Sequence, residues 1–418
     1  MPPLTTAVAD GTGVVALAGL LVAAHRHPRA RVEAAAALAA SALVLVAGLI
    51  SPEEAWDAVR PLLPVVAFLV TILVVAEVCA RAGVFTAAGH RVRRHSRGRP
   101  AALFTGTFLL AALVTTVLSL DATVVLVTPV AVAAAVGLGT SPRPVAYGCL
   151  RMANSASLLL PVSNLTNLLA MPHLDLTFAG FAVRMAPALA AVLVVEYVGL
   201  RLLFRRELAG HGVERREPRS PRLEPVPVVV VAAMLLGFAV LSPLGVEPAW
   251  VSAAAAAVLV VWARYRRLAS WQVAARAAHP SFALFVLALG VVVAGLGQGF
   301  LGDVAARLLP DGTSYVDLLA VAGIATVGAA LLTNLSATLL LLPLLAPLGT
   351  DAVLAALVGL GVGSGITWTG SLANLLWRRT LVRYGEPGSM LGTVAFHRVS
   401  LALTPLAVIA AVTALAVT

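Results

Sequence analysis

The sequence predicts an all-α integral membrane protein of about ten transmembrane helices plus two re-entrant hairpins, in two inverted repeats with two broken helices. Three observations support this fold class. The 418 residues are 60% hydrophobic and only 11% charged, whereas soluble proteins average about 25% charged residues. Apolar runs close to the roughly 20 residues that a membrane helix needs recur along the chain. Polar interruptions fall at matched places in the two halves.

Ten apolar runs are long enough to predict transmembrane spans. Asp10 lies in the first residues, without a basic segment before the first run. We therefore expect a retained span there, not a cleaved signal peptide. The predicted spans are residues 7–25, 30–50, 61–80, 143–171, 178–204, 225–243, 248–264, 279–300, 353–377 and 393–417.

Two further apolar regions are interrupted near their middle. Residues 101–137 are broken at 119–123, and residues 314–349 are broken at 333–338. Each arm has roughly 14–19 residues, which is short for a full span. Non-helical backbone at membrane depth must line a cavity walled by protein or filled with water. Both regions are therefore predicted to be re-entrant hairpins that do not cross the membrane.

The arginines predict the orientation. The net charge of +10 comes from arginine alone, because the chain contains no lysine. The arginines lie in short blocks between apolar runs, which is the positive-inside pattern and not a nucleic-acid-binding one. If neither hairpin crosses, most arginine blocks fall in the cytoplasm, most acidic loop residues fall outside, and both termini lie outside. We expect the basic segment Arg91–Arg99 to touch anionic membrane lipid.

Matched motifs define the repeats. Leu120-Asp121-Ala122-Thr123 parallels Leu335-Ser336-Ala337-Thr338, and residues 161–169 parallel 369–376. The first hairpin enters from the cytoplasm and the second from outside, which makes the repeat inverted. The predicted organisation is an N-terminal transmembrane helix (1–29), repeat 1 (30–204, with hairpin 101–137 and broken helix 143–171), a cytoplasmic loop and linker helix (205–247, whose longest polar stretch is Arg205–Glu224), and repeat 2 (248–418, with hairpin 314–349 and broken helix 353–377).

The two broken helices are the first candidate site. Pro161 removes a backbone donor and opens the first helix, so carbonyl and side-chain oxygens are exposed. Glycines 363 and 365 take the role of the proline in the second helix. A kinked helix that packs through small polar residues would be the alternative, but matched breaks in two halves point to a transport site. The candidate residues are Ser163, Asn164, Thr166, Asn167, Thr369, Ser371 and Asn374.

Asp121 is the second candidate, as the one acidic residue placed deep in the membrane. A carboxylate there is costly and by default functional, so we expect it to carry a proton or bind a cation. Its alternative role is to cap the return helix of the hairpin. Ser119 and Thr123 flank it, and Asn334, Ser336 and Thr338 complete the site from the second hairpin.

Four other polar residues receive separate interpretations. We expect Arg151 and Arg184 to extend toward the interface from nearby helix entrances, although either could bind an anion. Glu196 is placed near a cytoplasmic helix end. Asn154 either lines the site or joins helices, and the sequence leaves both open.

Other classes of site find little support. Cys79 and Cys149 make neither a disulfide framework nor a metal site. The chain has no G-x-x-x-x-G-K-[ST] loop and therefore no ATPase of its own. We expect no cofactor and no enzymatic activity. Uphill transport would be driven by an ion gradient or by a partner ATPase.

These elements resemble the ion transporter superfamily, and most closely its arsenite efflux permease family, related to the citrate and dicarboxylate permeases. The resemblance rests on residues 121–129, 156–167 and 370–377 and extends more weakly over nearly the whole chain. It implies export of arsenite or antimonite in exchange for protons, sometimes with a soluble ATPase subunit. The chain departs from the family at its hairpin tips: it has Leu120-Asp121-Ala122 for Asn-Asp-Gly, and Thr333-Asn334-Leu335-Ser336 for Asn-Asn-x-Pro.

The predicted function is proton-coupled efflux of arsenite or antimonite across a bacterial inner membrane. Asp121 would repel a dianion, whereas arsenious acid is neutral and suits hydroxyl and amide groups. No cysteine lies at either break, so hydrogen bonds must supply the selectivity. The alternatives are a sodium- or proton-coupled symporter of carboxylates or inorganic anions, and a cation/proton antiporter. Candidate protein partners are a second copy in a homodimer and a soluble ATPase subunit.

Overall fold

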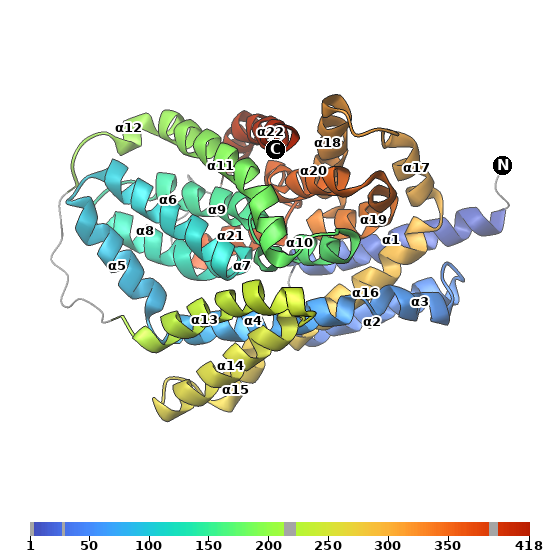
Figure 1. Ribbon diagram of the computed structural model, residues 1–418, viewed down its shortest axis with the longest axis horizontal. Coiled ribbons are helices and arrows are strands. Elements are labelled where there is room, and N and C mark those ends of the chain that lie inside the picture. The colour runs from blue at the N-terminus through green and yellow to red at the C-terminus, as the bar shows by residue number, and fades with distance from the viewer. Residues whose placement is uncertain (1–3, 27–29, 213–222, 384–391) are drawn as a thin grey trace.

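The computed structural model describes residues 4–26, 30–212, 223–383 and 392–418, and every regular element in these ranges is a helix (Figure 1). Ten residues of the predicted polar stretch, 213–222, lie outside the described residues, as do Arg29 and residues 384–391. The prediction of an all-α integral membrane fold is confirmed.

Nine helical segments among the described residues are long and apolar enough to cross a membrane. Three of them, Pro100–Val117, Leu120–Gly137 and Tyr315–Leu332, are arms of the predicted hairpins. The others match predicted spans and are Leu62–Arg81, Phe178–Leu203, Pro225–Leu244, Pro248–Tyr265, Trp271–Gly297 and Thr393–Ala416.

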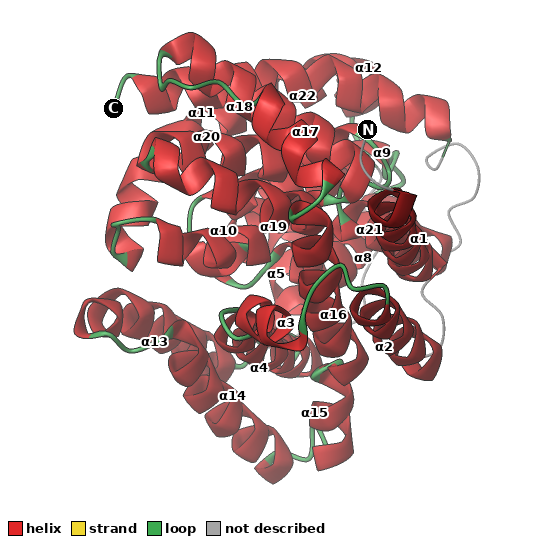
Figure 2. Cartoon of the chain, turned by 90° about the vertical axis from the view of Figure 1, so that its right-hand side faces the viewer, coloured by secondary structure: helices red, strands yellow, loops and turns green. Residues whose placement is uncertain are grey.

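The remaining helices belong neither to the two predicted hairpins nor to the two broken helices. Those of the first half are α1 (Leu4–Arg26), α2 (Ala30–Val46), α3 (Pro52–Val59), α4 (Leu62–Arg81), α5 (Val84–Ser96), α11 (Phe178–Leu203) and α12 (Arg205–Leu208). Those that follow are α13 (Pro225–Leu241), α14 (Pro248–Tyr265), α15 (Trp271–Ala277), α16 (Pro280–Gly297), α17 (Phe300–Leu308) and α22 (Thr393–Ala416). In Figure 2, α13, α14 and α15 lie at one edge of the molecule, and α4 packs against α14.

Each predicted hairpin is interrupted where its sequence is polar. The first consists of α6 (Pro100–Val117), the short α7 (Leu120–Ala122), the π-helical turn η1 (Thr123–Val127) and α8 (Thr128–Gly137). The π turn precedes Pro129, which has no amide hydrogen to continue a regular ladder. The second consists of α18 (Tyr315–Leu332), α19 (Asn334–Leu345) and the 3-10 turn η6 (Ala346–Leu348), with Thr333 alone at the break.

The two broken helices have the same construction. The first runs through α9 (Arg143–Ser155), the 3-10 turns η2 (Ala156–Leu158) and η3 (Pro161–Ser163), α10 (Leu165–Ala170) and η4 (Met171–His173). The second runs through α20 (Thr350–Gly361), η7 (Gly363–Ile366) and α21 (Leu372–Arg383). The number of residues from the start of α9 to the start of α20 equals the number from the start of α10 to the start of α21. The duplicated element order agrees with the predicted repeat, while the domain boundaries and the inversion stay predictions.

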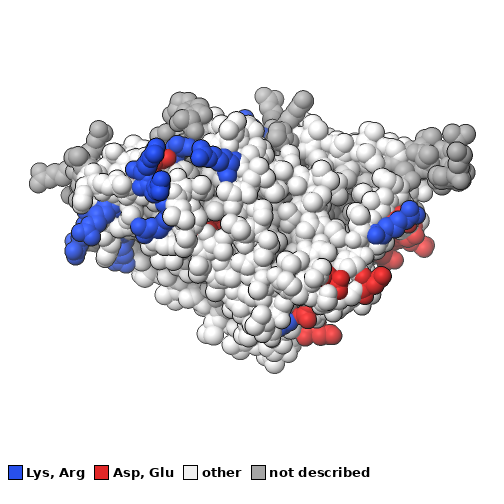
Figure 3. Space-filling view, turned by 90° about the horizontal axis from the view of Figure 1, so that it is seen from above, with Lys and Arg blue, Asp and Glu red and all other residues white. Residues whose placement is uncertain are grey.

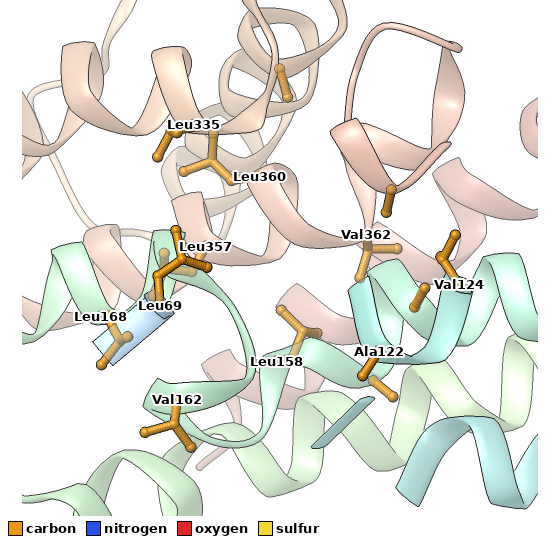
Figure 4. Close-up of a cluster of buried hydrophobic side chains, with 14 of the residues drawn as sticks. Leu69, Ala122, Val124, Leu158, Val162, Leu168, Leu335, Leu357, Leu360 and Val362 are labelled. Carbon is orange, nitrogen blue, oxygen red and sulfur yellow. The ribbon is translucent and has the colours of Figure 1, made fainter. Parts of the chain in front are cut away.

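The halves interlock at their centre. The segment after the first break, α10, contacts α19 and α20 of the second half, and α21 contacts η1 and α8 of the first hairpin. Each broken helix therefore ends against the hairpin of the other half. Buried apolar side chains from all four segments fill the junction (Figure 4), among them Ala122, Val124, Leu158, Val162, Leu335, Leu357 and Leu360.

Charged side chains separate along the long axis. In Figure 3, most of the visible arginines gather at one end and most of the visible acidic side chains at the other, with few charges between them. This is the distribution expected of a protein whose middle faces lipid and whose basic end faces the cytoplasm.

Candidate functional site

A cavity of about 50 Å³ lies where the hairpin tips meet the breaks. Each of these four segments contributes a polar side chain to its lining, and α4 and α16 contribute an apolar wall. The lining residues are Ser119, Leu120 and Asp121 of the first hairpin, Val162, Ser163, Asn164, Leu165 and Thr166 of the first break, Asn334 and Leu335 of the second hairpin, Ser371 and Leu372 of the second break, and Phe68, Leu69, Ile72 and Phe282 of the wall. Seven of the predicted site residues are therefore brought together.

Among the residues that the structure describes, Asp121 is the only charged one that lines the cavity. Within the described part of the chain its carboxylate has no hydrogen bond and no ion pair, although it is partly buried. The predicted capping role belongs to its neighbour instead, because Ser119 Oγ accepts a hydrogen bond from the amide of Ala122 at 3.2 Å. A carboxylate in this position requires a proton or a cation to offset the loss of water.

The other polar groups of the cavity are neutral. The carboxamide of Asn334 has no hydrogen-bond partner among the described residues. Ser371 Oγ accepts a hydrogen bond from the amide of Ala373 at 3.2 Å, in the same way that Asn164 Oδ1 accepts one from the amide of Thr166 at 3.2 Å. Ser163 donates to the carbonyl of Thr116 in the first hairpin at 2.6 Å. The cavity thus offers one acidic acceptor together with amide and hydroxyl groups.

Asn167 and Asn374 lie behind the cavity lining and hold the two breaks open. The Asn167 amide donates to the carbonyls of Ser157 and Leu160 at 2.8 and 3.1 Å. The Asn374 amide donates to the carbonyls of Ser364 and Thr367 at 3.0 and 2.8 Å. The acceptors lie ten and seven residues before the asparagine in both halves. These amides satisfy carbonyls that the interrupted helices leave without a partner.

Four further predicted site residues lie outside the lining, where they bond within their own half. Thr123 donates to the carbonyl of Ala111 at 3.3 Å, and Thr338 to that of Asn334 at 2.6 Å. Ser336 pairs with Thr333 at 3.2 Å, and Thr369 donates to the carbonyl of Ala330 at 3.2 Å. These hydroxyls stabilise the hairpins and the second break.

The expectation for Arg151 was wrong. Its side chain is 1% exposed and forms an ion pair with Glu196, which is completely buried. Glu196 is therefore a deeply buried acid within α11, not a residue at a helix end. This pairing could not be predicted from the sequence, since the residues lie 45 positions apart on α9 and α11. Arg184 remains partly exposed and pairs with Asp351 of α20.

Asn154 joins the two halves. Its amide donates to Asn374 Oδ1 at 2.8 Å, and its own oxygen accepts a bond of 3.4 Å from Ser364. Ser157 and Ser364, which sequence reasoning did not include, each donate to a carbonyl three residues earlier at 2.7 Å. Their matched spacing was the signal that would have revealed them.

Neither cysteine belongs to the site, as both are buried elsewhere. Among the described residues, no group of three or more His, Cys, Asp and Glu side chains could hold a metal ion.

Known proteins are similar to this chain in sequence and in fold. Residues 20–363 match the citrate transporter family, CitMHS. The chain is 29% identical over 367 residues to the arsenical pump membrane protein of Escherichia coli strain K12, covering 81% of this chain and 83% of that protein. It is 29% identical over 369 residues to the arsenical pump membrane protein of Yersinia enterocolitica, covering 82% and 84%.

A solved structure has the same fold. The YdaH transporter of Alcanivorax borkumensis, described as having an unusual topology, superposes with a TM-score of 0.59 at 17% identity, covering 88% of this chain and 89% of that one. The family match extends over more than half of the sequence. The chain is therefore a member of the citrate transporter (CitMHS) family, a multi-pass transporter of the bacterial inner membrane and not an enzyme.

Proposed function

We propose that this transporter exports arsenite or antimonite in exchange for protons, and that the cavity between the hairpin tips and the breaks is its solute site. The observation that carries the proposal is the composition of that cavity, which combines one unpaired carboxylate with neutral amide and hydroxyl groups. Two relatives at 29% identity are named arsenical pump membrane proteins, which agrees with this solute.

Charge favours a neutral solute over the citrate of the family name. No basic side chain of the described ranges lines the cavity, and Asp121 would repel a tricarboxylate. The nearby Arg151 is already paired with Glu196. Arsenious acid is uncharged at neutral pH and has three hydroxyl groups, each able to donate and accept a hydrogen bond. Hydroxyl and amide groups can bind it without a countercharge.

The cavity is large enough for this solute. Roughly 10–15 Å³ holds one water molecule, so about 50 Å³ has room for several heavy atoms. Arsenious acid has four heavy atoms.

Asp121 is the proton carrier in this proposal. The carboxylate takes up a proton when the cavity opens to the outside and releases it when the cavity opens to the cytoplasm. The solute moves in the opposite direction. Coupling follows if the empty cavity reorients only with a protonated Asp121, because an ionised carboxylate without a partner is costly inside the membrane. The ionised carboxylate then reorients only with the solute bound, when hydroxyl groups of the solute donate hydrogen bonds to it.

The test is arsenite transport in everted membrane vesicles, where export is measured as uptake. We expect arsenite to drive proton movement in the wild type and Asp121→Asn to abolish it. The matched control is Asp303→Asn, which changes an exposed acid of α17 and should retain wild-type coupling.

Other outcomes would redirect the proposal. Arsenite-driven proton movement at the wild-type rate in Asp121→Asn would exclude this residue as the carrier. Uptake of labelled citrate or succinate without arsenite transport would favour the carboxylate symporter instead. Sodium-dependent proton flux without any added solute would favour a cation/proton antiporter.

A further inference from the structure

Arg151 and Glu196 form a fully buried ion pair in the membrane-spanning part of the molecule. Arg151 Nε donates to both carboxylate oxygens of Glu196 at 3.0 Å, and Nη2 also donates to Oε1. The remaining nitrogen, Nη1, donates to Thr404 Oγ1 of α22 at 2.9 Å. One guanidinium therefore connects three helices, α9, α11 and α22.

A buried ion pair is an expensive way to join helices. Both charges lose their hydration, and apolar side chains of similar size usually stabilise a structure at least as well. The second half shows that the fold does not require the pair. Val358 of α20 lies at the position equivalent to Arg151 of α9. The helix that follows the second broken helix, α22, contains no acidic residue that could correspond to Glu196 of α11. The first break therefore has a polar anchor that its counterpart lacks.

The pair touches both breaks. Ser155, the last residue of α9 before the first break, donates to Glu196 Oε1 at 3.3 Å. Gly365 lies within the second break, where a Cβ atom would come within 2.7 Å of Nη1 of Arg151. A side chain at this position would force the guanidinium to shift from where it lies against that backbone. One turn further along α9, Asn154 bonds directly to Asn374 at 2.8 Å.

We propose that Arg151, held by Glu196, is a positioning residue that fixes the first break relative to the second and thereby sets the distances across the solute cavity. Asn164 and Ser371 face that cavity from the two breaks, and neither break is held by regular helical bonds. The inference rests on the proposed solute site. Its mechanism is geometric, because Arg151 does not itself line the cavity.

The decisive variant is the double replacement Arg151→Met/Glu196→Leu. Single replacements leave one buried charge without a partner and can prevent folding, whereas the apolar pair removes both charges together. We expect the double variant to reach the membrane and to raise the KM for arsenite about tenfold, with a maximal rate within about threefold of the wild type. Small misplacements of binding groups have effects of this size.

Two further variants separate positioning from stability. Arg184→Met/Asp351→Leu removes another Arg–carboxylate pair, between α11 and α20, that is partly exposed and distant in sequence from both breaks. It should change KM less than about twofold. Arg151→Lys keeps the charge but lacks the planar fork that reaches Glu196 and Thr404 together. It should not restore the wild-type KM.

Hydrogen–deuterium exchange of the purified protein tests the geometry without any solute. The double variant should exchange faster in residues 156–164 and 363–371, while residues 119–123 of the first hairpin keep the wild-type rate. Wild-type KM and wild-type exchange in the double variant would overturn the inference. If the wild type does not transport arsenite, the proposed function fails, and the exchange comparison alone decides the role of Arg151.

Discussion

Asp121 and Ser336 occupy equivalent places in the two Leu-x-Ala-Thr motifs, yet only Asp121 lines the cavity. Ser336 is completely buried and bonds to Thr333. A similar difference separates the breaks, where Thr166 of the first half lines the cavity and its counterpart, Ala373, has no polar group. The first half contributes the charge and most of the polar groups, and the second contributes Asn334 and Ser371.

The bonds that hold the breaks open are much more alike. Asn167 and Asn374 donate to carbonyls at identical sequence distances. Side chains that support the backbone are therefore shared by the halves, whereas side chains that face the cavity differ. The two halves therefore share the residues that shape the breaks, whereas the ionisable group of the cavity comes from the first half alone.

Moving the carboxylate should have the largest effect. In Asp121→Ser/Ser336→Asp the acid lies away from the cavity, so we expect proton-coupled arsenite transport to fall to the level of empty vesicles. The buried Asp at position 336 should also cost about 2.5–3.5 kcal/mol of stability. Both quantities can be measured, as transport in vesicles and as thermal unfolding in detergent.

The control for the swap is Asp121→Ser alone. It should lose coupling and keep near wild-type stability, since Asp121 has no partner among the described residues. Coupled transport in the swapped variant would show that the halves are interchangeable and would contradict the comparison.

The paired asparagines provide the next largest effect. Asn167→Ala should lower the free energy of unfolding by about 1–3 kcal/mol, because two buried carbonyls lose their donor. Asn374→Ala should cost about 1 kcal/mol more, because Asn374 Oδ1 accepts a bond of 2.8 Å from Asn154, whereas Asn167 Oδ1 accepts only a longer bond of 3.4 Å from Thr166. Thermal unfolding of both variants checks the order. A larger loss for Asn167→Ala would mean that the bond between the halves contributes little.

A smaller effect is expected for single polar groups of the second hairpin. Asn334→Ala removes an unpaired carboxamide from the cavity and should raise the KM for arsenite about fivefold, the equivalent of one hydrogen bond of about 1 kcal/mol. Ser336→Ala, two residues away, removes a hydroxyl that faces Thr333 and should change KM less than about twofold. Equal effects of the two variants would place the solute elsewhere.

The sequence was sufficient to predict the hairpins and the breaks because both depend on local chemistry. Polar residues, proline and glycine inside apolar runs interrupt helices, and the observed interruptions at Ser119, Thr333 and Gly363 lie where they were expected. The first broken helix differs, because α9 already ends at Ser155, six residues before Pro161. Asp121 was also identifiable, since an acidic residue within an apolar run is conspicuous.

The sequence could not show which side of each break faces the cavity. Asn164 and Asn167 lie three residues apart and look equivalent in sequence, but only Asn164 lines the cavity. The Arg151–Glu196 pair was missed for a related reason. Whether an arginine extends to the interface or is buried depends on a carboxylate contributed by another helix, and no local pattern reveals that partner.

The smallest effect concerns the backbone at the hairpin tips. Thr333 has φ 76° and ψ 154°, a conformation that a β-branched residue rarely adopts, whereas Ser119 at the other tip is extended. Strain of this kind costs about 1–3 kcal/mol. Thr333→Gly relieves it, and Thr333→Ala keeps it while losing the same bond to Ser336. We expect the Gly variant to be more stable than the Ala variant by about 1 kcal/mol in thermal unfolding, whereas equal stability would show that both tips are relaxed and differ only in their side chains.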